Sequence, residues 1–229
     1  MARLQQNLQK ESHLAAIGKM SARLAHEIKN PLGAIRGMAQ FLEKKLADLP
    51  VLKTMTSSIE KETFRLEELT RSILDFSKPA ELSLVELSLN AIVSDAICLF
   101  QLQNANSNIS LNMPEAPVKV SGDENAIRQI LINLLKNAID ATENNAEILV
   151  EIEINNYAAL IRVTNPGQLS TETVDHLFEP FYSTKTRGYG LGLPISMKLA
   201  QQMDCSLTLS NLDSGRVSAE LIFNGKMQQ

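Results

Sequence analysis

The stretch NLLKNAIDA, residues 133–141, decides how the second half of this chain folds. It continues a helical pattern that starts after Asp123, and its leucines and isoleucines cover one side of that helix. Asn133, Asn137 and Ala141 lie at positions i, i+4 and i+8, so they share another face. Asparagine lowers helix propensity, so two of them in a helix with an apolar side need a purpose. They offer amide oxygens suited to Mg²⁺, a cation held by few protein ligands plus phosphates and water; the alternative is two ordinary exposed polar positions.

Helix and strand patterns alternate on both sides of this stretch. The predicted elements are a helix from Ser88, strands at 108–113 and 118–121, the helix from Asp123, strands at 147–156 and 157–165, a helix from about Pro194, and strands at 206–211 and 216–223. The middle pair forms a hairpin around Asn155-Asn156. Since several strands have an antiparallel pattern, we expect one sheet with helices on one of its faces.

Residues 1–78 show no strand pattern and are predicted to be helical. Apolar residues recur there at spacings of three, four and seven, on both sides of a break at Asp48-Leu49-Pro50. They are Ile17, Leu24, Ile28, Ile35, Met38 and Leu42 before the break, and Leu52, Met55, Ile59, Leu66, Leu69, Ile73 and Phe76 after it. The simplest architecture is a helical hairpin. One hairpin leaves long apolar seams exposed, so we expect two copies to form a dimeric four-helix bundle.

These patterns predict an α+β multidomain chain. Residues 1–13 are polar and helix-prone, as in a coiled-coil lead-in, and residues 14–78 form the dimerising hairpin. Residues 79–87 are a linker, because Pro79 ends the second helix. Residues 88–225 form the α/β domain, whose first two helices are predicted to have Ser88 and Asp123 as N-caps.

The composition limits the classes of partner and the cellular compartment that we expect for this chain. The net charge of −4 gives no overall electrostatic case for a nucleic-acid or anionic-membrane partner. Cys98 and Cys205 lie far apart in apolar surroundings, so we expect two small buried residues in a reducing, cytoplasmic compartment. No apolar run approaches the roughly 20 residues that span a bilayer. The chain is therefore expected to be soluble as given, either alone or as the cytoplasmic part of a longer membrane-bound protein.

The stretch GYGLGLP, residues 188–194, holds three of the ten glycines of the chain. Glycine permits positive φ and close backbone approach, and consecutive free amides there can form an anion nest. Pro194 suits the first turn of a helix, whose amino end favours phosphate. Lys185 and Arg187, just upstream, could meet further phosphate charge. The alternative is a flexible loop that ends in a helix cap.

The stretch LFEPFYSTK, residues 177–185, places three aromatic residues within five positions of a chain in which aromatics make up only 4%. Such a cluster walls a pocket or anchors a mobile loop. Local core packing is the other reading, and both can hold together.

The stretch LAHEIKNPLGAIRG, residues 24–37, contains His26, one of three histidines. If Ile28 and Ile35 take heptad position a, His26 takes position f and points to water. Asn30 and the nearby glycines are polar or small, which leaves room for a large incoming group or a docking protein. A structural metal is not expected, because no second ligand has suitable spacing. A solvated surface histidine is the default alternative.

Taken together and in this order, the motifs resemble those of the sensor histidine kinases of two-component systems. AHEIKNPL resembles the phospho-acceptor motif of that family, and NLLKNAIDA its asparagine box. LFEPFYSTK resembles the phenylalanine box, and GYGLGL the second glycine box. The resemblance covers residues 14–224 and is closest to the nitrogen-regulator-like group, which has HEIKNP and a short ATP lid. It implies a dimeric histidine domain followed by a GHKL-type (Bergerat) ATP-binding sandwich.

The resemblance also implies residue roles. His26 matches the phosphorylated histidine, Glu27 the acidic residue that orients or deprotonates it, and Asn30 the position that helps place water for dephosphorylation of the regulator. Asn137 matches the Mg²⁺ ligand and Asn133 a phosphate or metal neighbour. The lid and phosphate contacts are matched by Lys185, Gly188, Gly190, Leu191, Gly192 and Leu193.

The first glycine box departs from the family pattern. The family has Asp-x-Gly-x-Gly after a strand, and its carboxylate accepts from the adenine amino group. Counting the alternation along YAALIRVTNPGQLS places Asn165 at the Asp position, followed by Pro166 and Gly167. Asparagine can still accept through its oxygen but carries no charge, so weaker ATP binding is expected. The alternative is a plain turn and a damaged nucleotide site.

The sequence therefore predicts an ATP:protein-histidine phosphotransferase. MgATP would phosphorylate His26, and an aspartate on the receiver domain of a response regulator would take the phosphoryl group; phosphatase activity toward that regulator is also expected. The alternative from another class is a non-catalytic dimeric docking scaffold or phosphatase with a degenerate nucleotide site. Another kind of GHKL ATPase, such as a chaperone, would leave the histidine hairpin unexplained.

Overall fold

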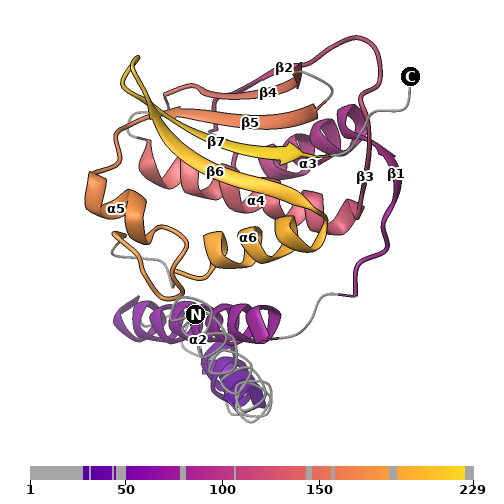
Figure 1. Cartoon of the computed structure of the whole chain (residues 1–229). Helices are drawn as coiled ribbons and strands as arrows, with labels where there is room; N and C mark the ends of the chain where they lie inside the picture. The colour runs from indigo at the N-terminus through magenta and orange to yellow at the C-terminus, as the bar shows by residue number, and fades with distance from the viewer. Residues whose placement is uncertain are drawn as a thin grey trace, which may run out of the picture. The chain divides into compact units, whose positions relative to one another are not determined.

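The computed structural model describes residues 28–30, 32–42, 44, 50–77, 81–105, 107–142, 146–155, 158–185 and 190–224. The chain divides into two units, Met1–Ala80 and Glu81–Gln229, which are described separately (Figure 1). The predicted phospho-acceptor residues His26 and Glu27, and Gly188 of the glycine-rich stretch, lie outside the described residues.

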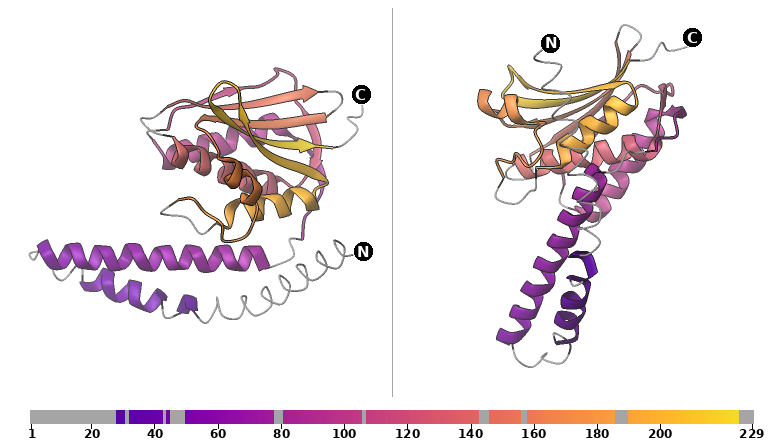
Figure 2. Two further views of the ribbon diagram at one scale, coloured as in Figure 1. Left: turned by 60° about the vertical axis from the view of Figure 1, so that its left-hand side comes forward. Right: turned by 60° about the horizontal axis from the view of Figure 1, so that its bottom comes forward.

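The first unit is a helical hairpin. Residues 28–30 and 32–42 are helical and run beside α2 (Pro50–Ser77), as Figure 2 shows. Arg36 Nη1 lies 2.5 Å from Glu67 Oε2, and Gln40 Nε2 donates to Glu60 Oε1 at 2.7 Å. The partner number falls as the residue number rises, so the two helices are antiparallel and the predicted hairpin is confirmed. Proline suits the first turn of α2, where its missing N–H costs nothing.

The apolar seam predicted from the sequence is exposed on the single hairpin, as expected, and a different stripe of residues closes the hairpin. Among the described residues of this unit, the buried ones are small or medium-sized: Leu32 and Ala39 on the first helix, and Thr56, Thr63 and Thr70, seven apart, on α2. The three threonine hydroxyls donate to backbone carbonyls of their own helix, which permits their burial. A pair of helices buries only one stripe. The predicted seam residues therefore remain exposed, among them Ile28, Ile35, Met38, Leu42, Leu52, Met55, Ile59 and Leu66.

The second unit is built on a five-stranded mixed sheet with the strand order β2-β4-β5-β7-β6. Its strands are β2 (Ile109–Asn112), β4 (Ile148–Asn155), β5 (Ala158–Pro166), β6 (Cys205–Leu212) and β7 (Arg216–Phe223). The pair β2 and β4 is parallel, and the other described neighbours in this sheet are antiparallel. The predicted hairpin of β4 and β5 is confirmed, with Leu149 opposite Thr164 and Asn155 opposite Ala158.

Three helices cover one face of this sheet, as predicted (Figure 1). They are α3 (Leu89–Gln103), α4 (Glu124–Ala141) and α6 (Gly192–Gln202). The core lies between the layers, where Ile127, Ile130 and Leu135 of α4 are completely buried. Each such side chain contributes about 1.5–3 kcal/mol relative to an exposed one. The strand residues that face the helices alternate with the others, as in Ile148, Val150 and Ile152 of β4.

A separate two-stranded sheet joins β1 (Val85–Ser88) to β3 (Lys119–Gly122). Residues 85–87 belong to the predicted linker, but here they form a strand, because β3 supplies hydrogen-bonding partners. Ser88 does occupy the N-cap of α3, yet its side chain makes no capping hydrogen bond. Instead, the first backbone N–H of the helix, at Leu89, donates to the Val118 carbonyl at 2.9 Å.

Both cysteines are free, but only one is buried. Cys205 is buried, and burial, with the nearby Asp204 carboxylate, raises its pKa to about 12. Cys98 is exposed on α3, so the expectation that both are buried is wrong for this residue. It sits on the outer side of a helix whose inner side packs on α4, and an apolar sequence environment does not distinguish the two sides. In the described part of the chain, no helix is both long and apolar enough to cross a membrane.

Asp123 caps α4, as the sequence predicts. Its Oδ1 accepts from the Ala126 N–H and its Oδ2 from the Ser83 N–H, both at 2.9 Å. These backbone hydrogen bonds, the one from Ala126 first, lower the pKa of Asp123. The cap thus fixes the start of the helix that carries the asparagine row.

We expect Asp123→Ala to lower the free energy of unfolding by about 1 kcal/mol at pH 7. Asp123→Asn, which still accepts from Ala126, should lose less. Because folding lowers this pKa, the stabilisation is complete above the unfolded value of about 3.9 and is lost as the pH falls through the folded value. Urea titrations should therefore show the curves of the wild type and of the Asp123→Ala variant converging below about pH 4; a gap that persists unchanged in more acidic solution would refute the role of the charge.

Candidate functional site

One face of α4 carries two of the predicted nucleotide-binding residues. Asn133, Asn137 and, less than one turn further on, Asp140 lie on the side that does not enter the core. Segments distant in the sequence contact this face through the side chains of Asn133 and Asn137. The patterned row seen in the sequence is therefore a meeting point of separate elements and not a solvated surface.

Asn133 joins α4 to the first turn of α6. Its Nδ2 lies 3.3 Å from the Gly192 carbonyl oxygen and 3.2 Å from Ser196 Oγ. Ser196 is completely buried, so it needs a polar partner inside the protein. Asn133 supplies this partner and at the same time holds the glycine-rich segment against α4.

Asn137 contacts the lysine that follows the aromatic cluster. Lys185 Nζ donates to Asn137 Oδ1 at 2.8 Å and to Asp140 Oδ2 at 3.0 Å. The two oxygens come from side chains three residues apart on α4, and they converge on one cationic atom. This arrangement brings the predicted lid lysine and the predicted Mg²⁺ ligand together.

A backbone hydrogen bond joins the two ends of the segment between the aromatic cluster and α6; we call this pair of residues, Phe181 and Gly190, the base of the segment. The Phe181 N–H donates to the Gly190 carbonyl at 3.0 Å. Both residues have positive φ, 67° at Phe181 and 63° at Gly190. A β-carbon added at Gly190 would lie 2.4 Å from the Tyr182 carbonyl oxygen, so only glycine fits there. The base therefore fixes where the segment leaves the aromatic cluster and where it enters α6.

The aromatic cluster only partly meets its expectation. Phe178 and Tyr182 are partly buried, and the Tyr182 ring lies 5.5 Å from the His176 ring, which matches local packing and an anchored loop. His176 belongs to the short helix α5 (Thr171–His176). Phe181, however, has 58% of its surface exposed.

The amino end of α6 lies beside Asn133. Leu191 is the N-cap residue and is buried, but no side chain caps this end. Gly192 and Leu193 form the start of the helix, with Pro194 in its first turn as predicted. Backbone N–H groups at such an end are suited to phosphate oxygens.

Asn165 lies near the end of β5, with only 7% of its surface exposed. It shares the helix-covered side of the sheet with Ile161 and Val163. Its Nδ2 donates to the Pro166 carbonyl at 2.8 Å. Gly167 has φ +146°, and its N–H donates to Gly215 in the turn between β6 and β7 at 3.2 Å. Asn165, the predicted adenine acceptor, is thus a buried side chain whose amide nitrogen is held by the neighbouring carbonyl.

The residues on α4 suit a bound cation. Asn137 and Asp140 offer hard oxygens, the type of ligand that Mg²⁺ prefers. The Lys185 ammonium lies on both oxygens and shows that they can share one positive charge. The predicted Mg²⁺ position at Asn137 therefore fits the local chemistry.

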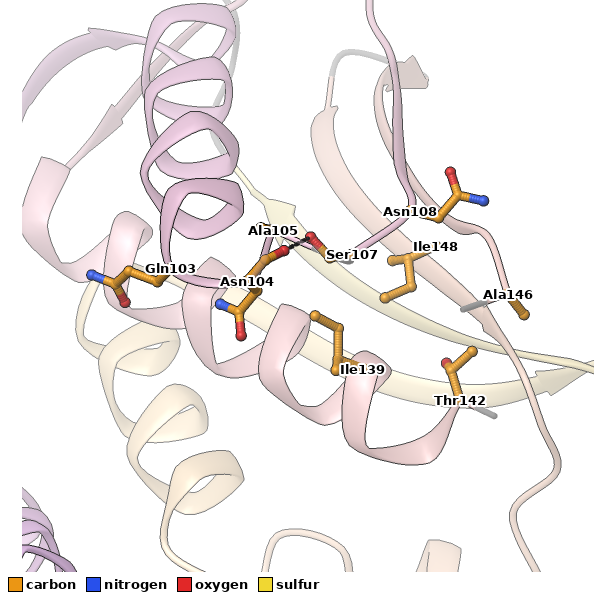
Figure 3. A pocket seen from close by; sticks show the side chains of 9 residues that line it. All are labelled: Gln103, Asn104, Ala105, Ser107, Asn108, Ile139, Thr142, Ala146 and Ile148. Carbon is orange, nitrogen blue, oxygen red and sulfur yellow. Dashed lines mark hydrogen bonds between the residues drawn. The ribbon is translucent and has the colours of Figure 1, made fainter. Parts of the chain in front are cut away.

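A pocket of about 320 Å³ lies elsewhere on this unit (Figure 3). It is lined by Gln103, Asn104, Ala105, Ser107, Asn108, Ile139, Thr142, Ala146 and Ile148. Ile139 is two residues after Asn137, or about 200° around the helix, so the pocket opens on the other side of α4. None of the predicted site residues lines it.

Two residues of this site were not predicted from the sequence. Ser196 and Asp140 both contact predicted residues through side chains. A sequence signal existed for Asp140, since it lies in the same NLLKNAIDA stretch three residues after Asn137. Ser196 gave no signal, because serine is common on helix surfaces. Asn30, predicted beside the phospho-acceptor, is helical and exposed in the first unit.

Comparison with known families identifies two regions. Residues 16–81 match the model described as His Kinase A (phospho-acceptor) domain. Residues 122–224 match the model described as histidine kinase-, DNA gyrase B-, and HSP90-like ATPase. Together the two models cover most of the chain.

Among curated proteins, sensor histidine kinase ZraS of Escherichia coli K12 is 29% identical over 203 residues, which are 87% of this chain and 43% of ZraS. Sporulation kinase E of Bacillus subtilis is 32% identical over 204 residues, 87% of this chain and 27% of that protein. The chain thus spans less than half of the length of these relatives.

Among solved structures, histidine kinase ThkA in complex with response regulator TrrA matches 97% of this chain and 66% of that chain, with 29% identity and a TM-score of 0.68. Full-length ShkA in complex with AMPPNP matches 90% of this chain and 45% of that chain, with a TM-score of 0.70. Its 20% identity indicates a shared fold only.

Two neighbouring glycines allow a matched test of the segment base. Gly190→Ala should lower the free energy of unfolding by at least about 1–2 kcal/mol, because the added methyl group meets backbone atoms at a positive φ. Gly192→Ala should change it by less than about 1 kcal/mol, because its β-carbon would come no closer than 3.8 Å to Asn133. Urea denaturation of both variants measures the difference, and equal losses would show that the base is not constrained as described.

Proposed function

The chain belongs to the sensor histidine kinases, and from this we propose that it is an ATP-dependent autokinase that phosphorylates His26. The phosphoryl group then passes to an aspartate on the receiver domain of a response regulator. The observation that carries the proposal is the double contact on α4: Asn133 holds the glycine-rich segment and Asn137 holds Lys185. Three motifs that are separate in the sequence thus meet at one helix face, as a nucleotide site requires.

In the proposed reaction, a neutral imidazole nitrogen of His26 attacks the γ-phosphorus of ATP, and the bond from this phosphorus to the β,γ-bridging oxygen breaks. The unperturbed histidine pKa of roughly 6.5 leaves much of the ring neutral at pH 7. Glu27 orients the ring or takes its proton. ADP leaves, and the chain contributes mainly by positioning the reactants and neutralising charge.

On the nucleotide side, Asn165 would accept from the adenine amino group, with Gly167 permitting the turn beside it. Lys185 and the backbone of residues 188–193 would contact the phosphates. Asn137 would hold Mg²⁺, with Asn133 next to it. When bound, the metal supplies charge neutralisation on the phosphate oxygens.

We infer that the working unit is a homodimer. The first unit leaves a row of large apolar side chains exposed along both helices, including Ile35, Met38, Ile59 and Leu66. Their spacing matches the predicted heptads, so a second hairpin would cover them in a four-helix bundle. By its heptad position, His26 would then lie on the outer side of the bundle, accessible to a partner domain.

A response regulator is the proposed protein partner. ThkA, 29% identical to this chain, is described in complex with one. Phosphatase activity toward that regulator is part of the proposal, with the exposed Asn30 placing the attacking water. We also place the chain in the nitrogen-regulator-like group, on the HEIKNP sequence at 26–31, and in the cytoplasm, because both cysteines are unpaired.

Labelling with γ-³²P ATP tests the autokinase directly. The wild-type protein should incorporate label into an acid-labile, base-stable phosphoprotein, as expected for a phosphorylated imidazole. His26→Gln should incorporate none, because it removes the nucleophile, while its fold and its nucleotide binding stay unchanged. Label retained at the wild-type level in His26→Gln would overturn the assignment.

A second candidate function is a dimeric docking scaffold that binds or dephosphorylates a regulator without using ATP. The observation in its favour is the uncharged Asn165 at the position where the family has aspartate. Titration with a fluorescent ADP analogue separates the two candidates, since the autokinase requires saturable, Mg²⁺-dependent binding and the scaffold does not.

In the same titration, Asn165→Asp should bind the analogue about fivefold more tightly, because a charged acceptor makes a stronger hydrogen bond than a neutral one. Asn165→Ala should bind more weakly than the wild type. If neither change alters the affinity, Asn165 does not contact the base.

A further inference from the structure

Asp140 has no role in the function proposed above, yet it makes a side-chain contact between α4 and the segment that carries Lys185. Its Oδ2 lies 3.0 Å from Lys185 Nζ, across 45 residues of sequence. The side chains are 54% and 30% exposed for Asp140 and Lys185, so this is an accessible ion pair at the rim of the site.

The position of Asp140 on α4 is electrostatically unfavourable without this lysine. Asp140 lies in the last turn of the helix, where the macrodipole is negative and a carboxylate is repelled. No basic residue occupies that turn. The ammonium of Lys185 therefore supplies the compensating charge from outside the helix, and the carboxylate in turn attracts the segment that carries the lysine.

The same ammonium also occupies the amide oxygen that the metal is proposed to use. Lys185 Nζ lies 2.8 Å from Asn137 Oδ1, within hydrogen-bonding distance. A divalent cation on this oxygen would lie within a few ångströms of the ammonium, and two positive charges at that separation repel strongly. Lys185 must therefore leave Asn137 when Mg²⁺ reaches it.

We propose that Asp140 is a positioning residue that latches Lys185 over Asn137, and that Mg²⁺–nucleotide opens this latch by replacing the ammonium on the amide oxygen. This inference rests on the proposed function for the identity of the cation and the nucleotide. Once released, Lys185 can turn its ammonium toward the phosphates. Because this ion pair must break when Mg²⁺–nucleotide binds, Asp140 slightly lowers the affinity for nucleotide. In the free protein, it keeps Lys185 beside the site.

The latch predicts a specific coupling between two residues. Exposed ion pairs contribute little, so opening this one should weaken MgADP binding by only about two- to fivefold. Asp140→Asn should therefore tighten MgADP binding by this factor. In a Lys185→Gln background there is no latch to open, so Asp140→Asn should have no effect. ADP is used because it lacks the γ-phosphate to which Lys185 is expected to turn.

The experiment is a double-mutant cycle by isothermal titration calorimetry on the full chain, with MgADP and the four combinations of these two substitutions. Asp95→Asn, an exposed site on α3, is the control for the same change in net charge. An equal tightening by Asp140→Asn in both backgrounds would mean simple repulsion of phosphate and would overturn the latch. Weaker binding by Asp140→Asn would identify Asp140 as a metal ligand instead, which also overturns it.

A second readout does not depend on nucleotide binding. In protein without added nucleotide, amide hydrogen exchange at residues 182–185 should be faster in Asp140→Asn and in Lys185→Gln than in the wild type, and unchanged in Asp95→Asn. Unchanged exchange in both latch variants would overturn the inference even if MgADP binds. A wild-type protein that fails to bind MgADP would contradict the proposed function, while the exchange rates would still decide whether the latch exists.

Discussion

The packing of α4 against the sheet is the constraint on which the rest of the ATPase-like unit depends. One side of this helix is filled by Ile127, Ile130 and Leu135, which are completely buried and leave the helix no freedom to rotate about its axis. Rotation by one residue, about 100°, would carry these side chains into water and the asparagines into the core. The apolar side therefore determines where Asn133 and Asn137 point. Asp123 adds a fixed starting point through its hydrogen bond to Ala126.

The polar side of α4 then makes side-chain contacts with two elements that are distant in the sequence. Asn133 holds the first turn of α6 through Gly192 and the buried Ser196. Asn137 holds Lys185, and the Phe181–Gly190 hydrogen bond closes the base of the segment between them. Asn133 thus bridges α4 and α6, and Lys185 bridges the Asn137 amide and the Asp140 carboxylate. These polar groups form a surface beside the amino end of α6, which no side chain caps. Such a surface suits phosphate and its metal better than it suits an apolar ligand.

Much of the fold could be predicted from the sequence, because the spacing of apolar residues indicates which side of a helix or strand is buried. The order of the other helices and strands of the second unit, without β1 and α5, followed from alternation and local chemistry, as did the β4–β5 hairpin and the Asp123 cap. The apolar seam of the first unit was predicted to be exposed on a single hairpin, and its described residues are largely exposed. The residues that close the hairpin itself could not be predicted, because the heptad pattern marks only the large apolar side chains. In that hairpin, Thr56, Thr63 and Thr70 close the contact instead. Cys98 was predicted to be buried but is exposed, because an apolar neighbourhood in sequence does not tell the two sides of α3 apart.

The contacts of the candidate site could be predicted only in part. Asn133 and Asn137 stood out as polar residues on one face of a helix with an apolar side, and the resemblance to the family assigned them roles. The pairing of Lys185 with Asp140 could not be predicted, because it depends on the path of a segment whose ends are fixed by Phe181 and Gly190, both at positive φ. Likewise, Ser196 carries no sequence signal, since its burial arises only when α6 lies against α4.

The claim that the polar side of α4 receives the cation of a bound nucleotide is tested most directly by the Mg²⁺ dependence of ADP binding in Asn137→Ala, measured by calorimetry with Mg²⁺ and with EDTA. Asn137→Asp, which keeps a hard oxygen at this position, is the matched variant. We predict that the wild type and Asn137→Asp bind ADP more tightly with Mg²⁺, and that Asn137→Ala loses this gain while its unfolding transition stays cooperative. A full Mg²⁺ gain in Asn137→Ala would contradict the account.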